Sequence, residues 1–211
     1  MLRPLRPGVA APTLSPMPTS MPVLETPRLA IRPFVMDDLE RVHALLDAAW
    51  DEQTPLAERE KWLRWTVAGY EALASLNQPP YGDRAVVLRE TGELAGVTGL
   101  VPSLGPFGLL PSFGGAIEDP ASRLFTPQAG LYWAVDPAHQ GRGIATEAAG
   151  ALIAWAFEHL SLLRVVATTT YDNERSIAVM RKLGMRIERN PLPEPEWFQV
   201  AGVLDNPAVR S

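Results

Sequence analysis

The segment from Leu131 to Glu147 constrains the fold more than any other part of the chain, because an apolar strand, a short turn and a helix follow one another in it without a break. Gly141 and Gly143 lie in the turn, and an alanine-rich helix then runs to Leu160. Backbone N–H groups at a helix N-terminus have no intrahelical partner and carry the positive end of the helix dipole. The segment therefore predicts an anion site at Gln140–Thr146.

Other interpretations of this turn remain open. Glycines between a strand and a helix often serve only the turn itself. A P-loop would end in Gly-Lys-Ser/Thr, and the turn contains no lysine. A dinucleotide-binding fingerprint would have a third glycine where Thr146 stands, within repeated strand–helix–strand units that the chain lacks. Both nucleotide patterns fit poorly, whereas Arg142 would add a charge-assisted contact to a bound phosphate.

Hydrophobic periodicity predicts the elements around this segment. Apolar residues that alternate indicate strands, and those that recur every three or four positions indicate helices. The predicted strands cover 29–34, 84–89, 94–101, 131–135, 163–170, 185–188 and 198–204, and the predicted helices cover 37–49, 57–76, 143–160 and 173–183. Asp37 or Asp38 is the expected N-cap of the first helix. The stretch 102–128, rich in Gly, Pro, Phe and Leu, is predicted to be a long irregular loop and a candidate lid.

Composition excludes several classes of function. The net charge of −5 and the pI near 5.3 argue against a nucleic-acid partner, which needs a concentrated basic face. No stretch approaches the roughly 20 apolar residues of a membrane span. The chain has no cysteine, which is compatible with the cytoplasm, and its three histidines lack ligand spacing, so we expect no metal. Residues 1–22 are expected to form a flexible Pro-rich tail, and 23–211 a single domain.

The turn also carries a family signature. Gln140-x-x-Gly143-x-Ala145 matches the acetyl-CoA-binding pattern Gln/Arg-x-x-Gly-x-Gly/Ala of GNAT acetyltransferases. The flanking Val135-Asp-Pro and Ala145-Thr-Glu-Ala resemble the family too, as does the Asn173-x-x-Ser…Lys-Leu-Gly184 helix that follows after one more strand. The opening Leu24-Glu-Thr-Pro-Arg-Leu29 is similar to the branch with bacterial ribosomal-protein N-terminal acetyltransferases. The resemblance covers roughly residues 23 to 205.

This resemblance implies a mixed α/β (α+β) fold with a twisted sheet of about seven strands and about four flanking helices. It implies that two central strands splay apart, so that the pantetheine arm of acetyl-CoA pairs with a strand edge. The residues implied to hold acetyl-CoA are Val135 (through its backbone N–H), Gln140, Gly141, Arg142, Gly143, Ile144, Ala145, Thr146 and Asn173.

The chain departs from the family pattern at two catalytic positions. The usual tyrosine acid falls on Met180, which cannot donate a proton, and the usual glutamate base falls on Gly130. By resemblance to the ribosomal-protein branch, Ser176 is the expected acid, although it can equally pack or cap locally. Tyr132, Glu118, Asp119 or a chain of water molecules remain open as the base.

The resulting hypothesis is a cytoplasmic N-acetyltransferase, a monomer or homodimer, that moves an acetyl group from acetyl-CoA to a primary amine by direct attack. The amine belongs to a small molecule or to a protein N-terminus. The alternative is a non-catalytic acyl-CoA-binding regulatory module, because both usual catalytic residues are missing beside an intact cofactor signature.

Overall fold

The computed structural model describes residues 17–210, which form an eight-stranded mixed sheet flanked by four α-helices. The strands lie in the order β1-β2-β3-β4-β5-β6-β8-β7. In chain order the elements are β1 (Leu24–Glu25), β2 (Leu29–Arg32), α1 (Leu39–Trp50), α2 (Leu56–Ser75), β3 (Gly82–Leu88), β4 (Leu94–Gly105), β5 (Thr126–Val135), α3 (Ile144–His159), β6 (Arg164–Thr169), α4 (Glu174–Lys182), β7 (Arg186–Arg189) and β8 (Val200–Asp205). Within residues 17–210, none of the helices combines the length and the apolar character that a membrane span needs.

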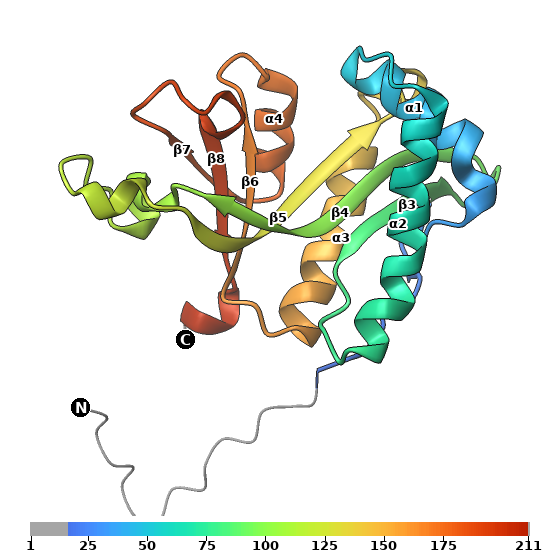
Figure 1. Cartoon of the computed structure of the whole chain (residues 1–211), viewed down its shortest axis with the longest axis horizontal. Helices are drawn as coiled ribbons and strands as arrows, with labels where there is room; N and C mark the ends of the chain where they lie inside the picture. The colour runs from blue at the N-terminus through green and yellow to red at the C-terminus, as the bar shows by residue number, and fades with distance from the viewer. Residues whose placement is uncertain (1–16, 211) are drawn as a thin grey trace, which may run out of the picture.

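The sheet consists of two antiparallel parts that meet at one short parallel junction. Strands β1 to β5 pair antiparallel, and so do β6, β8 and β7. Between the two parts, β5 and β6 share a single register pair, Gly130 with Val166. Beyond that pair the two strands diverge, as Figure 1 shows. The residues of β5 after Gly130 therefore have a partner strand on the β4 side alone.

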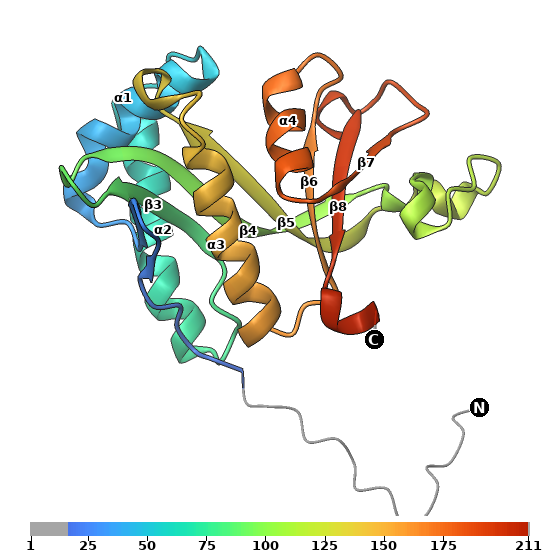
Figure 2. The same ribbon diagram turned by 180° about the vertical axis from the view of Figure 1, so that it is seen from behind.

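The helices cover both faces of the sheet. Helices α1 and α2 lie on one face in Figure 1, and α3 crosses the opposite face, which Figure 2 brings to the front. Helix α4 packs beside α3, where Met180 joins Leu152 and Ala156 in one buried cluster. On the other face of β6 and β8, Phe107 and Phe198 form a separate buried cluster.

The structure confirms the mixed sheet and the four helices, with one strand more than the expected seven. The extra strand is β1, which has only two residues and therefore too few to show alternation. The predicted loop 102–128 is wrong at both ends, because β4 continues to Gly105 and β5 begins at Thr126, so that the two strands project as a paired arm (Figure 1).

Several apolar residues at the tip of that arm belong to the core, whereas Leu104, Leu124 and Phe125 are exposed. Phe107, Leu109 and Leu110 are almost completely buried, and Phe107 and Leu110 pack beside Val166 of β6. Burial of these three side chains accounts for part of the Phe- and Leu-rich composition, and the candidate lid stays a prediction.

The predicted tail, 1–22, lies mostly outside the described residues. Of its last six residues, Met21 is buried in the cluster that also contains Leu152. Packing against the core thus begins at least two residues before position 23.

Candidate active site

The turn between β5 and α3 is built on two glycines with positive φ. Gly141 has φ 75° and Gly143 has φ 79°, in the left-handed region that favours glycine. A Cβ at Gly141 would meet no atom within 4 Å, and one at Gly143 would meet only the Arg28 guanidinium at 3.6 Å. The backbone conformation therefore requires glycine here, and the space in front of the turn stays open.

The same turn begins α3 without a capping side chain. Gly143 is the N-cap, and no side chain accepts a hydrogen bond from the first turn of this 16-residue helix. Ile144 points into the core, whereas Ala145 and Thr146 remain partly exposed. The first turn of α3 therefore has no capping side chain, which is the arrangement that an anion site at a helix N-terminus needs.

A clamp from the N-terminal part of the chain supports the turn. The Glu147 carboxylate accepts hydrogen bonds from the Thr26 hydroxyl (2.6 Å) and the Arg28 Nε (2.7 Å). Arg28 Nη1 also donates to the Arg142 carbonyl at 2.9 Å. Burial raises the pKa of Glu147, but these donors outweigh it, so the net pKa lies below its ordinary value. The carboxylate therefore stays charged and holds Arg28 beside the turn.

Sequence reasoning did not identify Arg28 as part of this site. The two motifs that meet here, Leu24–Leu29 and Ala145–Ala148, were each recognised, but no spacing in the sequence shows that they touch. Because 119 residues separate Arg28 from Glu147, only the fold brings them together.

The edge of β5 beyond Gly130 faces the divergence from β6. The Asp136 N–H donates to the Ala95 carbonyl of β4, whereas the Val135 carbonyl accepts from the Gln140 side chain at 3.0 Å. Backbone groups alternate sides along a strand, so the Val135 N–H points away from β4, toward the gap. A cavity of about 140 Å³ lies in this gap, lined by Val101, Pro102, Ser103, Gly130, Leu131, Tyr132, Val166, Ala167 and Thr168.

The N-terminus of α4 lies across the gap from the turn. The Arg175 guanidinium donates to the Gln140 side chain at 3.0 Å, which links α4 to the turn. Asn173 is the N-cap of α4, and its Oδ1 accepts from the Ser176 N–H at 3.1 Å. The Asn173 side-chain NH₂ remains available for a ligand because the cap uses only the oxygen. Ser176 is partly exposed, whereas Met180 is fully buried and serves the core.

Tyr132 extends from β5 across β4 to β3. Its ring passes over Gly99, where a Cβ would come within 2.3 Å of it, and its hydroxyl donates to the Asp83 carboxylate at 2.5 Å. The Thr66 hydroxyl donates to the same carboxylate at 3.2 Å. Burial and the Asp83 charge raise the pKa of Tyr132 well above 10, so the Tyr132 hydroxyl is protonated and donates to Asp83 at neutral pH.

Neither the family position of the glutamate base, Gly130, nor the two acidic candidates of the arm places a carboxylate in the gap. A Cβ at Gly130 would lie 2.8 Å from the Ser103 Cβ, which leaves no room for a glutamate. Glu118 and Asp119 are exposed in the β4–β5 arm, where the Asp119 carboxylate caps the 3-10 helix η4 (Pro120–Arg123). Contacts thus link Val135 to Gln140, and Gln140 to the first turn of α4 that contains Asn173 and Ser176, whereas the two acidic residues lie in the arm.

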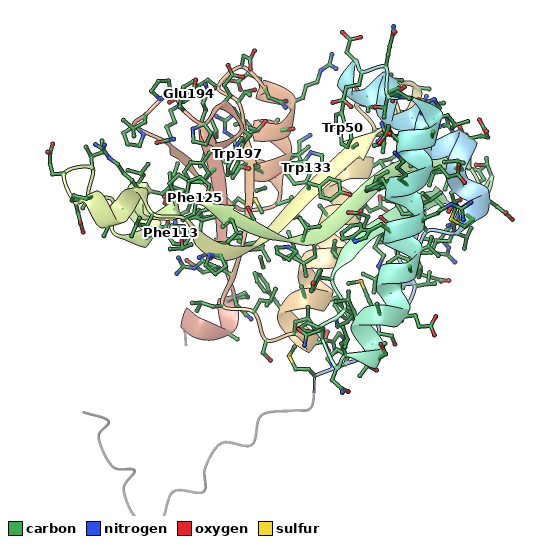
Figure 3. The ribbon with its side chains drawn as sticks, in the orientation of Figure 1. Trp50, Phe113, Phe125, Trp133, Glu194 and Trp197 are labelled. Atoms are coloured by element: carbon green, nitrogen blue, oxygen red, sulfur yellow. The ribbon has the colours of Figure 1, made fainter. Side chains whose placement is uncertain are left out.

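Trp133 is a further side chain at this gap that sequence reasoning did not single out. It lies between β5 and α4 in Figure 3, is partly exposed, and packs against the cluster that contains Met180. Trp133 therefore places a partly exposed indole on β5, on the side of α4.

Comparison with known proteins agrees with this geometry. Residues 28–186 match the family model described as an acetyltransferase (GNAT) domain. YoaA of Bacillus subtilis, described as an uncharacterized N-acetyltransferase, is 26% identical over 170 residues, which cover 79% of this chain and 84% of YoaA. YnaD of the same organism, also described as an uncharacterized N-acetyltransferase, is 41% identical over 56 residues, 26% of this chain, and that match spans only 33% of YnaD.

Solved structures share the fold. An acetyltransferase from Agrobacterium tumefaciens has a TM-score of 0.63 at 24% identity, covering 93% of this chain and 99% of that one. The ribosomal-protein-S5-alanine acetyltransferase from Vibrio fischeri has a TM-score of 0.60 at 18% identity, covering 89% and 98%. The family match extends over most of the described sheet and includes the glycine turn and α4. The chain therefore belongs to the GNAT family, whose members use acetyl-CoA as the acetyl donor.

Proposed function

We propose that this protein transfers an acetyl group from acetyl-CoA to a primary amine, on a small molecule or a protein N-terminus, at the gap between β5 and β6. The observation that carries the proposal is the unpaired edge of β5 directly before an uncapped α3. An extended pantetheine arm can pair with that edge as an added strand does, and the pyrophosphate can bind the N–H groups at Gln140–Thr146. Cytoplasmic location is part of the same proposal, given the chain's lack of cysteine.

Three groups of the chain have distinct roles. Acetyl-CoA supplies the acetyl group as an activated thioester. The Val135 N–H faces the gap and would donate a hydrogen bond to the thioester carbonyl oxygen, where negative charge develops. The free NH₂ of Asn173 would hold the pantetheine. The Ser176 hydroxyl would donate to the departing sulfur, and because a thiol has an ordinary pKa of about 8.5, this weak donor is sufficient.

The base is water in this proposal. Tyr132 is a protonated donor to Asp83, and Gly130 cannot be replaced by a carboxylate without moving Ser103. The acceptor amine therefore loses its proton to solvent at the open gap and attacks in the neutral form. Reaction then depends on the fraction of neutral amine, which the amine's own pKa determines.

Release of free thiol from acetyl-CoA tests the role of Ser176. With a panel of polyamines, aminoglycosides, amino acids and peptide N-termini, we expect saturable turnover with at least one amine. Ser176→Ala should lower kcat by about 100-fold, the lower end of the usual contribution of a general acid, with acetyl-CoA affinity unchanged. Ser75→Ala, at an exposed serine near the end of α2, is the matched control and should retain wild-type kcat. Unchanged kcat in Ser176→Ala would remove Ser176 from the reaction.

A second function is favoured by the two departures from the family pattern, Met180 and Gly130. A non-catalytic acyl-CoA-binding regulatory module needs the glycine turn but neither an acid nor a base. It would bind acetyl-CoA tightly and release no thiol with any amine of the panel, which distinguishes it from the enzyme.

A further inference from the structure

Arg84 of β3 is a buried charged residue outside the gap. Arg84 is only 2% exposed, and its Nε has no hydrogen-bond partner. Its polar contacts are a long one of 3.4 Å from Nη1 to the Met21 carbonyl and the face of the Tyr70 ring, 5.0 Å from the guanidinium carbon. Among residues 17–210, no carboxylate forms an ion pair with it. A buried charge of this kind is costly unless it is paired.

The neighbouring carboxylate does not compensate this charge. Asp83 precedes Arg84 on β3, but consecutive side chains of a strand point to opposite faces, and the two Asp83 oxygens accept from Tyr132 and Thr66. The other strongly buried arginine shows the usual solution: Arg59 is 6% exposed and contacts the Asp47 carboxylate at 3.0 Å. Arg84 is thus a buried guanidinium whose counter-charge must come from elsewhere. Burial accordingly lowers the pKa of Arg84, against a small opposing effect of Tyr70.

Arg84 lines a cavity of about 100 Å³. A single water molecule needs roughly 10–15 Å³ of such space, so the cavity has room for a group of several heavy atoms. Its lining includes Tyr81 and the exposed Ser20, which carry hydroxyl groups, and the apolar residues Pro33 and Leu73. The cavity therefore offers one cation, hydroxyl donors and an apolar side.

We propose that this cavity binds one small monocarboxylate, with Arg84 as its counter-charge. A planar guanidinium matches a carboxylate with two parallel hydrogen bonds, and its single charge balances the single charge of that group. A phosphate would bring −1.5 to −2 charges against one cation. The apolar wall formed by Pro33 and Leu73 suits a short hydrocarbon tail.

This site is separate from acetyl transfer. No residue that lines the Arg84 cavity also lines the cavity between β5 and β6. Binding of a carboxylate can therefore be measured without acetyl-CoA, and it does not depend on the proposed function.

Thermal unfolding of the full chain tests the proposal, with propionate as the probe. Propionate replaces chloride in the buffer, so that the ionic strength stays constant. A ligand that binds only the folded state raises Tm, by about 3–5 °C for a chain of this size at ten times Kd. We expect this increase to saturate with propionate and to be absent with phosphate. No saturable increase with propionate, or saturation with phosphate alone, would overturn the proposal.

Three variants identify the site. Arg84→Met should abolish the propionate-dependent increase, and Leu73→Trp, which fills the cavity from a partly exposed position, should do the same while keeping Arg84. Arg64→Met, at an exposed arginine of α2 paired with Glu60, should retain the full increase. If Arg84→Met does not fold, Leu73→Trp decides the result. An undiminished increase in Leu73→Trp, or in folded Arg84→Met, would contradict the assignment.

Discussion

The Asp38 carboxylate is held by hydrogen-bond donors that the fold brings together around it. Asp38 occupies the expected N-cap position of α1, but its carboxylate makes no capping hydrogen bond. It accepts instead from both terminal nitrogens of Arg32, at 2.7 Å each, and from the Val35 N–H at 2.9 Å. Burial raises the pKa of Asp38, but these donors outweigh it and hold the net pKa below 3.8. The sequence identified the residue and not its partners, since Arg32 lies on the preceding strand.

Replacement of Asp38 by asparagine should therefore be destabilising in a pH-dependent way. A group whose pKa is lowered in the folded state contributes stability above its unfolded pKa and loses that contribution as pH falls through the folded value. At pH 7 we expect Asp38→Asn to lower the free energy of unfolding by about 2 kcal/mol, as for other charged hydrogen bonds. The difference from wild type should shrink below about pH 3.8, measured by urea unfolding at pH 7 and pH 3.

Asp37→Asn is the matched control, because Asp37 is exposed beside Asp38. It should change stability by less than about 0.5 kcal/mol. Equal effects of the two variants at pH 7, or an Asp38→Asn effect that does not change with pH, would contradict the role of the Arg32 contact.

At the scale of elements, the glycine turn has the strictest backbone requirement of the site. Gly143 has φ 79° and open space around its Cβ position, so alanine there is opposed by backbone strain rather than by packing. Gly143→Ala should lower the free energy of unfolding by about 1–2 kcal/mol, the cost of the left-handed conformation for an L-residue. Urea unfolding measures this difference.

Gly69 in the middle of α2 provides the opposite case. It has no positive φ, and a Cβ there meets no atom within 4 Å. Gly69→Ala should stabilise the chain by about 0.5–1 kcal/mol, because alanine favours the helix and reduces the entropy of the unfolded chain. Stabilisation by Gly143→Ala, like that by Gly69→Ala, would show that the turn does not need positive φ.

Elements were predictable from the sequence where apolar residues recur at regular intervals along the whole segment. The expected helix 57–76 is observed as α2 at Leu56–Ser75, and the helix 173–183 as α4 at Glu174–Lys182. The β4–β5 arm was missed because Pro102, Gly105 and Pro127 interrupt the alternation, although the pairing continues to Gly105 and Thr126. Short 3-10 helices in the tip of the arm contain too few residues to show a period.

At the scale of the whole molecule, the divergence of β5 from β6 creates the gap. The sequence indicated this divergence through the family resemblance alone, because no local pattern records how many residues two parallel strands share. In the structure only Gly130 and Val166 pair, and the position of the cavity follows from that single pair. The Arg84 cavity likewise could not be predicted from the sequence. Its lining residues are spread between positions 20 and 84, and only folding brings them together.

The open gap has a consequence for pH dependence. With water as the base, kcat/KM should rise tenfold per pH unit up to the pKa of the acceptor amine and level off there. The plateau should begin near pH 8 for a peptide N-terminus and near pH 10 for a lysine-like amine. Pre-steady-state or steady-state thiol release across pH 6–10.5 measures this profile. A plateau at the same pH for both amines would reveal an ionising group of the enzyme and contradict a solvent base.

The most direct test of the central claim, that the gap and the glycine turn hold acetyl-CoA, is a calorimetric titration of the chain with acetyl-CoA. We predict one molecule bound per chain in the wild type and in Gly69→Ala. Folded Gly143→Ala should bind about tenfold more weakly, a loss of about 1.4 kcal/mol, because its turn presents the N–H groups less well. Absence of binding in the wild type, or equal affinity in folded Gly143→Ala, would contradict the account.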